Sequence, residues 1–378
     1  MKSSVLNGRP TFCFIDLEAL RWNFQQVRAR VGRGVKILSM VKADAYGHGA
    51  RAVAAALAAE GSDAFGVATV EEGIDLRQAG IRQSIVVLAG LYLEQLDLLL
   101  QHELIPVLHE LETLKALEKA VGARGMTWPI HLEIDTGMAR LGFRDAQIDD
   151  WLPELSQLKA LKLEGVFSHF SDAETANENY TEKQLKSFRV VIGHLRRATF
   201  APSLIHMAKS GAIINVPESH LEMVRPGLIL YGIYPSPELT KAIRLKPVLS
   251  WKTRILQLQR LPRGSAIGYG RTFTTKKTSL IATLPVGYAD GYKRLFSNRA
   301  AVLVRSERAP VVGRVSMDLT TVDVTDIGKV QLGDEVVLLG RQGDAEISAD
   351  EMAAWANTIS YEILTSIGAR VPRIHHHF

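Results

Sequence analysis

The chain has 378 residues, of which 47% are hydrophobic, and a formal net charge of +5, with Lys and Arg scattered among Asp and Glu. This length and composition suffice for a large hydrophobic core and a second domain, and the scattered charges argue against a nucleic-acid-binding surface. The single cysteine, Cys13, excludes an intrachain disulfide and a cysteine-based metal cluster. We expect Cys13 to be a small buried apolar residue.

The N-terminal residues 1–10 lack the apolar segment and the small-residue cleavage site of a secretory signal. The alanine-rich apolar run at 52–59 is too short to cross a bilayer. We therefore expect a cytoplasmic protein that does not bind a membrane.

Eight apolar runs bounded by turn residues predict β-strands in the first two thirds of the chain. Between most of them apolar residues recur every three to four positions, which predicts helices such as 50–60, 70–79, 110–121 and 181–197. This alternation predicts an α/β fold with a (β/α)8 TIM-like barrel over residues 14–245. The predicted strands are 35–42, 64–69, 84–90, 104–109, 129–135, 162–170, 203–210 and 223–232.

Beyond residue 245 the pattern changes to short β-branched runs broken by Pro and Gly, which predicts a separate, mostly-β domain over residues 246–378. A helix is expected from Ser348, where Ser348 and Glu351 form a capping-box pattern. Pro372 is expected to end the ordered structure, and His375 to His377 are left out of the functional argument. The predicted strands are 254–261, 279–284, 300–305, 320–324 and 335–340.

A lysine, Lys42, directly follows the apolar run 37–41 and precedes the segment Ala-Asp-Ala-Tyr-Gly-His-Gly. Partial desolvation of an amine lowers the cost of its neutral, nucleophilic form, which a Schiff base with an aldehyde cofactor requires. The alternative is a surface lysine whose aliphatic stem covers apolar neighbours. Lys42 is thus a candidate cofactor ligand.

Several motifs far apart in the chain resemble one family. With the Lys42 segment, they are Asp-Thr-Gly-Met-Ala-Arg-Leu-Gly at 135–142, Phe-Ser-His-Phe at 167–170, Met-Val-Arg-Pro-Gly at 223–227, Leu-Pro-Val-Gly-Tyr-Ala-Asp-Gly-Tyr at 284–292 and Gly-Arg-Val-Ser-Met-Asp at 313–318. They resemble motifs of the alanine racemase family, and segments 359–364 and 368–373 fit as well. The resemblance covers nearly the whole chain.

The resemblance implies a homodimeric enzyme that uses pyridoxal 5'-phosphate (PLP) to interconvert L- and D-alanine and supplies D-alanine for peptidoglycan. It also implies that residues 1–13 join the second domain. Lys42 is implied to bind PLP and then act as one base, while Tyr288 of the partner subunit acts as the second base on the opposite face of the substrate. Each monomer alone would then lack a complete site.

Arg225 resembles the family arginine that faces the pyridine nitrogen of PLP. Because guanidinium does not give up its proton, the ring nitrogen is expected to stay unprotonated, which favours racemisation over transamination. The substrate carboxylate is implied to meet Arg140 and the backbone amide of Met317, with Asp318 lining a narrow gate. The residues implied to bind the phosphate are Tyr46, Ser210, Tyr361 and the backbone amides of Gly227 and Leu228. No metal site is expected.

The candidate residues of the first domain fall at the carboxyl ends of predicted strands, where barrel enzymes build their active sites. Purely structural residues would be scattered between both ends of the barrel, so this placement favours catalysis. The residues are Lys42, Glu133, Asp135, His169, Ser210, Arg225 and Gly227.

Three residues leave alternatives open. Glu133 stands where many family members have a lysine that becomes carbamylated, and it either supplies the same negative charge from a shorter side chain or is satisfied elsewhere. Lys209 stands where an asparagine is common, and it either contacts the phosphate or points away. His169 either supports Arg225 by hydrogen bonding or is a satisfied core residue.

Two other functions remain open from the sequence. PLP-dependent decarboxylases of basic amino acids combine a barrel with a β-domain, but they typically place an acid at the pyridine nitrogen, whereas this chain offers Arg225. A single-barrel PLP-binding protein would need no domain carrying Tyr288.

Overall fold

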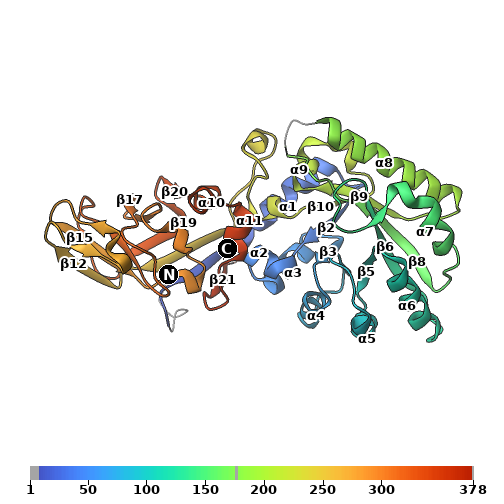
Figure 1. The fold of residues 1–378 in the computed structure, drawn as a ribbon, viewed down its shortest axis with the longest axis horizontal. Coiled ribbons are helices and arrows are strands. Elements are labelled where there is room, and N and C mark those ends of the chain that lie inside the picture. Colours follow the sequence, from blue (N-terminus) through green and yellow to red (C-terminus); the bar gives the residue numbers. More distant parts are fainter. Residues whose placement is uncertain (1–7, 175–177, 377–378) are drawn as a thin grey trace. The chain divides into compact units, whose positions relative to one another are not determined.

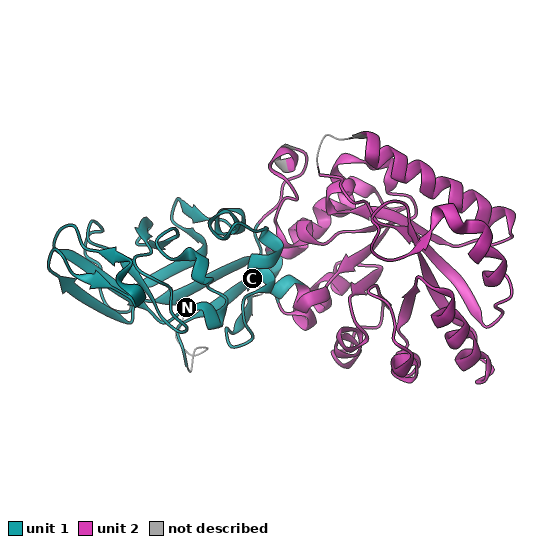
Figure 2. Ribbon diagram, in the orientation of Figure 1, with its two compact units in different colours: residues 1–18, 46–48, 247–378 teal, residues 19–45, 49–246 magenta. Residues whose placement is uncertain are grey.

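The computed structural model describes residues 8–174 and 178–376. The chain divides into two compact units, which Figure 2 shows in two colours. One unit comprises Ala19–Ala45 and Gly49–Lys246, and it is called the barrel unit here. The other comprises Met1–Glu18, Tyr46–His48 and Pro247–Phe378, and it is called the β unit.

The barrel unit is built on eight parallel strands, and the sheet closes because β5 pairs with β6. The predicted TIM-like barrel is therefore confirmed (Figure 1). A short additional strand, β7 (Phe143–Arg144), pairs with β6. The barrel strands are β2 (Lys36–Met40), β3 (Ala64–Val67), β4 (Ser84–Val87), β5 (Ile105–Leu108), β6 (Trp128–Asp135), β8 (Leu161–Ser168), β9 (Leu204–Lys209) and β10 (Met223–Arg225).

Helices follow the strands and lie around the outside of the sheet in Figure 1, with their apolar positions buried. In α6, for example, Leu114, Leu117 and Val121 recur at helical spacing and are buried. The helices are α1 (Leu17–Val31), α2 (Lys42–Gly47), α3 (Ala50–Ala59), α4 (Val70–Gln78), α5 (Leu96–Gln101), α6 (Leu111–Gly122), α7 (Ile148–Leu155), α8 (Glu178–Arg197) and α9 (Ser210–Asn215).

The eighth barrel strand is much shorter than predicted. The sequence predicts a strand over 223–232, but β10 ends at Arg225, before Pro226. Proline has no backbone N–H to donate to a neighbouring strand, and the chain continues into the 3-10 helix Leu228–Tyr231. The apolar residues of this helix are buried, which explains why its pattern resembles that of a strand.

The β unit contains a mixed sheet in the order β17-β16-β19-β11-β1-β21, with β20 paired to β19, and two smaller sheets, β12-β15-β18 and β13-β14. Two helices, α10 (Ala349–Ala356) and α11 (Ser360–Thr365), follow β20. The strands are β1 (Phe12–Asp16), β11 (Leu249–Arg254), β12 (Gln257–Leu261), β13 (Ala266–Ile267), β14 (Phe273–Thr274), β15 (Ser279–Leu284), β16 (Ala301–Val304), β17 (Glu307–Pro310), β18 (Thr320–Asp323), β19 (Glu335–Gln342), β20 (Ala345–Ile347) and β21 (Arg373–His376).

The two chain ends meet within the β unit. Strand β1 pairs antiparallel with β11 and parallel with β21, and Cys13 is fully buried between them, as predicted. The expectation that Pro372 ends the ordered structure is wrong, because β21 follows it directly. The Nε2 atom of His375 lies 2.8 Å from the carbonyl oxygen of His48, so this histidine belongs to the fold.

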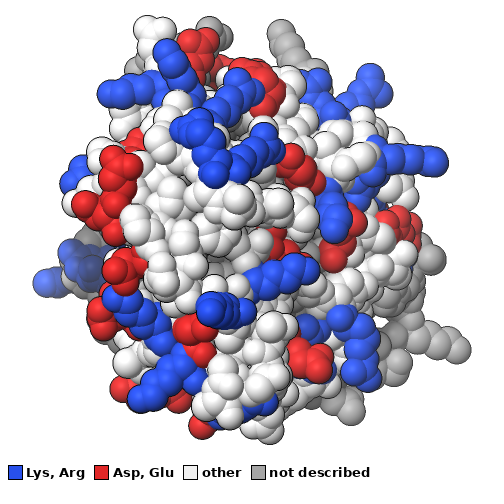
Figure 3. Space-filling model, turned by 90° about the vertical axis from the view of Figure 1, so that its right-hand side faces the viewer, with Lys and Arg blue, Asp and Glu red and all other residues white. Residues whose placement is uncertain are grey.

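At the start of α10, the Ser348 side chain accepts a hydrogen bond from the backbone N–H of Glu351 at 3.1 Å, as the capping pattern predicts. Among the described helices, none combines the length and apolar character needed to span a membrane. Figure 3 shows positive and negative side chains interspersed over the visible face.

Candidate active site

The carboxyl end of the barrel gathers most of the candidate residues of the barrel unit. Glu133 and Asp135 end β6, His169 directly follows β8, and Arg225 ends β10. Three assignments shift slightly from the predicted strand ends. Lys42 lies two residues beyond the end of β2, Ser210 opens α9, and Gly227 lies beyond β10 in the turn before the 3-10 helix. The carboxyl ends of barrel strands are the face on which such enzymes bind substrates.

The turn that carries Lys42 is left-handed. Ala43, Asp44, Ala45 and Tyr46 have φ angles of 52°, 52°, 53° and 55°, and Gly47 follows at 81°. Left-handed helical backbone costs roughly 1–2 kcal/mol for each non-glycine residue. Four such residues in succession persist only where the surrounding structure holds them, and such strain gathers at functional sites.

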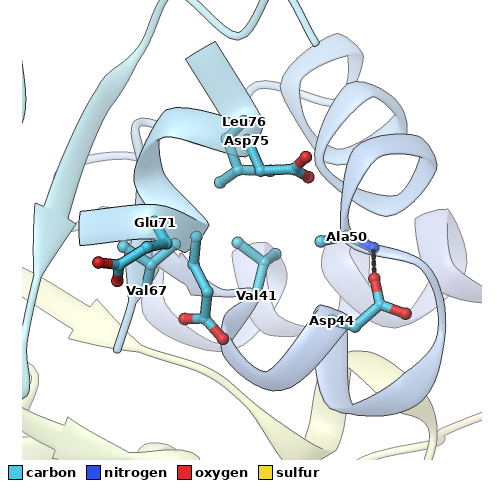
Figure 4. A pocket seen from close by; sticks show the side chains of 8 residues that line it. Val41, Asp44, Ala50, Val67, Glu71, Asp75 and Leu76 are labelled. Carbon is cyan, nitrogen blue, oxygen red and sulfur yellow. Dashed lines mark hydrogen bonds between the residues drawn. The ribbon is translucent and has the colours of Figure 1, made fainter. Parts of the chain in front are cut away.

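Acidic side chains hold this turn. One carboxylate oxygen of Glu72 accepts from the backbone N–H of Ala43 at 2.7 Å and the other from that of Ala68 at 2.7 Å. The Asp44 carboxylate accepts from the backbone N–H of Ala50 at 2.7 Å, which Figure 4 marks with a dashed line. These bonds fix the direction in which the chain leaves Lys42.

The pocket in Figure 4 lies beside this turn, has a volume of about 370 Å³ and is lined by the carboxylates of Asp44, Glu71, Glu72 and Asp75. Its charge repels anions, so it does not suit a ligand that carries a phosphate. The described residues also contain no group of three His, Cys, Asp or Glu placed to hold a metal ion.

The amine of Lys42 is made easier to deprotonate. Its pKa is lowered by burial and by the positive charges of Arg140 and Arg225, and Glu72 opposes this only in part. A larger fraction of neutral amine follows at physiological pH. The neutral form is the one that attacks a carbonyl group or accepts a proton.

Arg225 is a buried guanidinium held by neutral acceptors. Its Nη1 atom donates to Nδ1 of His206 at 2.8 Å, and its Nη2 atom donates to the backbone carbonyls of Ser168 at 2.8 Å and Met207 at 3.2 Å. The guanidinium carbon lies 4.6 Å from the centre of the Phe167 ring. Burial lowers the Arg225 pKa to about 10, so the group stays charged at neutral pH.

His169 takes a weaker part in this arrangement. Its Nδ1 atom lies 3.4 Å from Nη2 of Arg225. Burial and then the nearby cations hold the His169 pKa well below its usual value, so the ring is neutral at physiological pH. The cations that lower it are Arg225, Lys209, Arg140 and Lys42, which shows how strongly positive this end of the barrel is.

Glu133 is a buried carboxylate among these cations. Burial raises its pKa, while the charges of Arg225 and Arg140 oppose that rise. Glu133 and Arg140 form no direct ion pair in the part of the chain that the structure describes. The Arg140 segment is instead shaped by Asp135, whose carboxylate accepts from the backbone N–H groups of Gly137 at 2.9 Å and Ala139 at 3.0 Å.

Lys209, which stands where the family commonly has an asparagine, forms an ion pair. Its ammonium donates to the carboxylate of Glu174 at 3.0 Å. The next residue, Ser210, accepts at its Oγ atom a hydrogen bond from the backbone N–H of Gly227 at 3.0 Å. Two of the residues implied to bind the phosphate are therefore neighbours within the barrel unit.

Five candidate residues lie in the β unit, namely Tyr46, Tyr288, Met317, Asp318 and Tyr361. The rings of Tyr46 and Tyr361 are neighbours, with centroids 5.9 Å apart, and burial together with Tyr361 raises the pKa of Tyr46. Tyr288 is 41% exposed and Met317 is 53% exposed. Their segments are joined by the backbone, because the N–H of Ala289 donates to the carbonyl of Met317 at 3.0 Å.

The turn that carries Tyr288 is clamped by a residue that the sequence analysis missed. The buried carboxylate of Asp290 accepts hydrogen bonds from Arg9, from Arg370 at 2.6 Å and from the backbone N–H of Gly287 at 3.0 Å. Burial raises the Asp290 pKa, but these donors outweigh burial and lower it overall. Arg370 also donates to Asp318 at 2.7 Å, so the clamp extends to the predicted gate residue.

Gly287 permits the close approach of the Tyr288 turn to the Met317 segment. A Cβ atom at this glycine would lie 2.3 Å from the carbonyl oxygen of Ser316 and 2.4 Å from that of Met317. Gly287→Ala is expected to destabilise the protein by about 1–3 kcal/mol and to lower activity, because the turn must move away. Thermal unfolding and turnover measure both effects. Gly328→Ala is the control, since its added methyl group meets nothing within 4 Å. Equal behaviour of the two variants would contradict this prediction.

Two family models match the chain. Residues 15–235 match the alanine racemase N-terminal domain, and residues 248–375 match the alanine racemase C-terminal domain. The chain belongs to the alanine racemase family. Its activity is that of an amino-acid racemase, which decides against the decarboxylase and the non-catalytic PLP-binding protein.

Relatives and solved structures agree with this assignment. An alanine racemase of Halothermothrix orenii is 45% identical over 365 residues, covering 97% of this chain and 96% of the relative. The alanine racemase of Bacillus anthracis with bound L-Ala-P has a TM-score of 0.92 at 33% identity, covering 99% of this chain and 96% of that one. The alanine racemase of Bartonella henselae with covalently bound pyridoxal phosphate has a TM-score of 0.87 at 30% identity, covering 98% and 100%.

Because position 133 holds a glutamate and no lysine, we predict that this enzyme does not depend on carbamylation at that position. Glu133→Gln is expected to raise KM and to lower kcat/KM roughly fivefold, or about 1 kcal/mol, since a nearby negative charge on the Arg140 side is lost. Bicarbonate should not affect the wild-type rate.

Glu133→Gln should also be at least as stable as the wild type at neutral pH. The folded pKa of Glu133 is raised, so ionisation favours unfolding as pH rises through the carboxyl range.

Initial rates with and without bicarbonate, together with thermal unfolding between acid and neutral pH, check these expectations. Unchanged kinetics in Glu133→Gln would make Glu133 a bystander. A variant less stable than wild type at neutral pH would show that the ionised carboxylate stabilises the fold. Glu112→Gln, on the exposed side of α6, is the control for loss of a negative charge.

Proposed function

We propose that this racemase interconverts L- and D-alanine with PLP, acting in the cytoplasm to supply D-alanine for peptidoglycan. The observation that carries the proposal is the cationic carboxyl end of the barrel, where Lys42, Arg140 and Arg225 act on one another and on His169. A phosphorylated cofactor and a substrate carboxylate are both anions, so this end of the barrel is suited to receive them.

The donor set also fits PLP. The lowered Lys42 pKa matches an amine that must bond to an aldehyde, and the Bartonella henselae relative carries pyridoxal phosphate covalently. The Arg225 guanidinium, charged and fixed by neutral acceptors, matches a donor to the unprotonated pyridine nitrogen. The proposal assigns the phosphate to Tyr46, Ser210, Tyr361 and the backbone amides of Gly227 and Leu228.

When bound, PLP supplies the electron withdrawal that makes the substrate Cα–H acidic. The chain supplies the proton transfers. Lys42, with its lowered pKa, accepts or donates a proton on one face of Cα, and Tyr288 does so on the other face. A two-base arrangement inverts the configuration, because the proton leaves from one face and returns to the opposite one.

The other side chains orient the reactants. Arg140 and the backbone amide of Met317 are proposed to hold the substrate carboxylate, and the Asp135 turn fixes the segment that bears Arg140. Arg225 remains protonated, since guanidinium gives up its proton only at high pH. It can therefore donate a hydrogen bond to the pyridine nitrogen without transferring a proton to it. Asp318 is proposed to line a gate that admits small side chains.

Tyr288 is proposed to act in the site of a partner subunit, so that the enzyme is a homodimer with shared sites. The support is that Tyr288 is exposed while the turn that bears it is held rigidly through Asp290. Exposed aromatic side chains on rigid turns are typical of residues that contact a partner.

A chiral assay of L-alanine, L-serine and L-lysine with added PLP tests the proposed function. D-Alanine is expected to form fastest. Protein that binds PLP but forms no D-alanine would overturn the proposal, and faster conversion of lysine would reassign the substrate. Sedimentation at working concentration reports the dimer.

A further inference from the structure

A chain of hydrogen-bonding side chains runs through the barrel core away from Arg225. Nδ1 of His206 lies 2.8 Å from Nη1 of Arg225, and Nε2 of His206 lies 3.1 Å from Nδ1 of His131. Both histidines are fully buried. Sequence reasoning singled out neither of them, although each is flanked by apolar residues, His131 by Ile130 and Leu132 and His206 by Ile205 and Met207.

Arg225 fixes the direction of every bond in this chain. Guanidinium can only donate, so Nδ1 of His206 must be an unprotonated acceptor. In a neutral ring the proton then lies on Nε2, which donates to Nδ1 of His131, and the proton of His131 lies in turn on its own Nε2. Burial, followed by the charge of Arg225, lowers the His131 pKa to about 3 and holds that of His206 well below its usual value, so both rings are neutral.

The last N–H of this chain reaches a small cavity. Nε2 of His131 is buried, has no hydrogen-bond partner among the described residues and lies 3.9 Å from a carboxylate oxygen of Glu164. Both residues line a cavity of about 60 Å³, which has room for a water molecule. The other charged groups at this cavity are Lys36 and Asp63, and the Asp63 carboxylate is taken by Arg28 at 2.9 Å and by the backbone N–H of Ile37 at 2.8 Å.

The backbone is shaped to allow this arrangement. Between β6 and β8 the register passes from Ile130 opposite Leu163 to His131 opposite Gly165, so Glu164 is the extra residue of a β-bulge. A Cβ atom at Gly165 would lie 2.4 Å from Nδ1 of His131. The glycine thus leaves the space that the imidazole fills, and the bulge changes the direction of the Glu164 side chain.

We propose that Glu164, through a water molecule in this cavity, accepts from Nε2 of His131, and that His131 and Glu164 are positioning residues for Arg225. Donation from one nitrogen of an imidazole raises the basicity of the other, and such effects add along a hydrogen-bonded chain. The carboxylate therefore strengthens the bond by which His206 holds Nη1 of Arg225. The effect on catalysis rests on the proposed function, whereas the bond directions do not.

Nitrogen-15 NMR of the PLP-loaded protein, labelled at its 11 histidines, tests the proposal. Signals are assigned by single replacement of His131 or His206 with Asn. Both rings are expected to be neutral and protonated on Nε2 at pH 7, with an Overhauser effect from water to the Nε2 proton of His131. The proposed hydrogen-bond chain would be overturned by a proton on Nδ1 of either ring, by a charged ring, or by the lack of a water contact at His131.

Glu164→Gln separates the positioning role from packing, because Glu164 is partly exposed and the amide is nearly isosteric. The variant should shift the nitrogen signals of His131 and His206 and lower kcat/KM about 2- to 10-fold. Glu112→Gln should change neither. If the nitrogen signals of His131 and His206 do not shift in Glu164→Gln, the proposed hydrogen-bond chain is overturned. If they shift while kcat/KM stays at the wild-type value, the positioning role is overturned. Absence of racemase activity in the wild type would instead count against the proposed function, since the NMR result does not depend on it.

Discussion

Replacing Lys42 with alanine is expected to lower kcat for alanine racemisation by at least about 10³-fold, because the change removes the residue proposed to be both the cofactor ligand and one of the two bases. The physical basis is the lowered pKa of the Lys42 amine, which burial and two arginines produce at the end of the barrel. The visible absorption of lysine-bound PLP should disappear from the purified variant at the same time.

Borohydride reduction of the wild type followed by peptide mass spectrometry checks the site directly, and the cofactor should be found on Lys42. Lys162→Ala, at an exposed position of β8, is the control and should keep both absorption and activity. Label on another lysine, or full activity in Lys42→Ala, would refute the assignment.

The positions of the candidate residues in the barrel unit could be predicted because the successive apolar runs mark the strands, and parallel strands bring their carboxyl ends to one edge of the sheet. Lys42, His169 and Arg225 each follow or end such a run, so their common location needed no knowledge of side-chain contacts. The short strand at Arg225 was misjudged because the buried 3-10 helix after Pro226 has the same apolar composition as a strand.

The left-handed turn after Lys42 could not be predicted. Alanine favours right-handed helix, and nothing in the residue types 43–46 indicates four successive positive φ angles. The turn depends on Glu72, which lies on α4 and accepts from the N–H of Ala43. Local propensity is here overridden by a tertiary contact, as is typical of strained functional segments.

Contacts between distant parts of the sequence also could not be predicted. The clamp on the Tyr288 turn joins Arg9 to Asp290 across 281 positions, and the nearby Thr11 hydroxyl donates to the carbonyl of Pro285. The bond between Arg225 and His206 depends on which strands become neighbours in the closed barrel. A polar residue in an apolar strand was the available signal, and it indicates burial without naming the partner.

Replacing Tyr288 with phenylalanine is expected to lower kcat/KM for racemisation by about 10²- to 10⁴-fold, since it removes the proposed base on one face of Cα. The loss in kcat/KM must be equal in both directions, because L- and D-alanine are equally stable. Exchange of the α-proton with D₂O separates the two bases. The variant should still exchange the proton of one enantiomer, through Lys42, and should not exchange that of the other. Equal exchange of both enantiomers would rule out Tyr288 as a base.

Mixing the Lys42→Ala and Tyr288→Phe proteins is expected to restore activity, because the proposed shared site would take Lys42 from one subunit and Tyr288 from its partner. Random exchange of subunits makes half of the dimers mixed, and each mixed dimer has one intact site of two, so about one quarter of wild-type activity should return. The matched control mixes Lys42→Ala with the double variant Lys42→Ala, Tyr288→Phe, in which no intact site can form. Subunit exchange is verified separately by native mass spectrometry. If exchange is complete and the first mixture stays as inactive as the control, both bases belong to one chain, and the exposed Tyr288 turn does not act across a subunit interface.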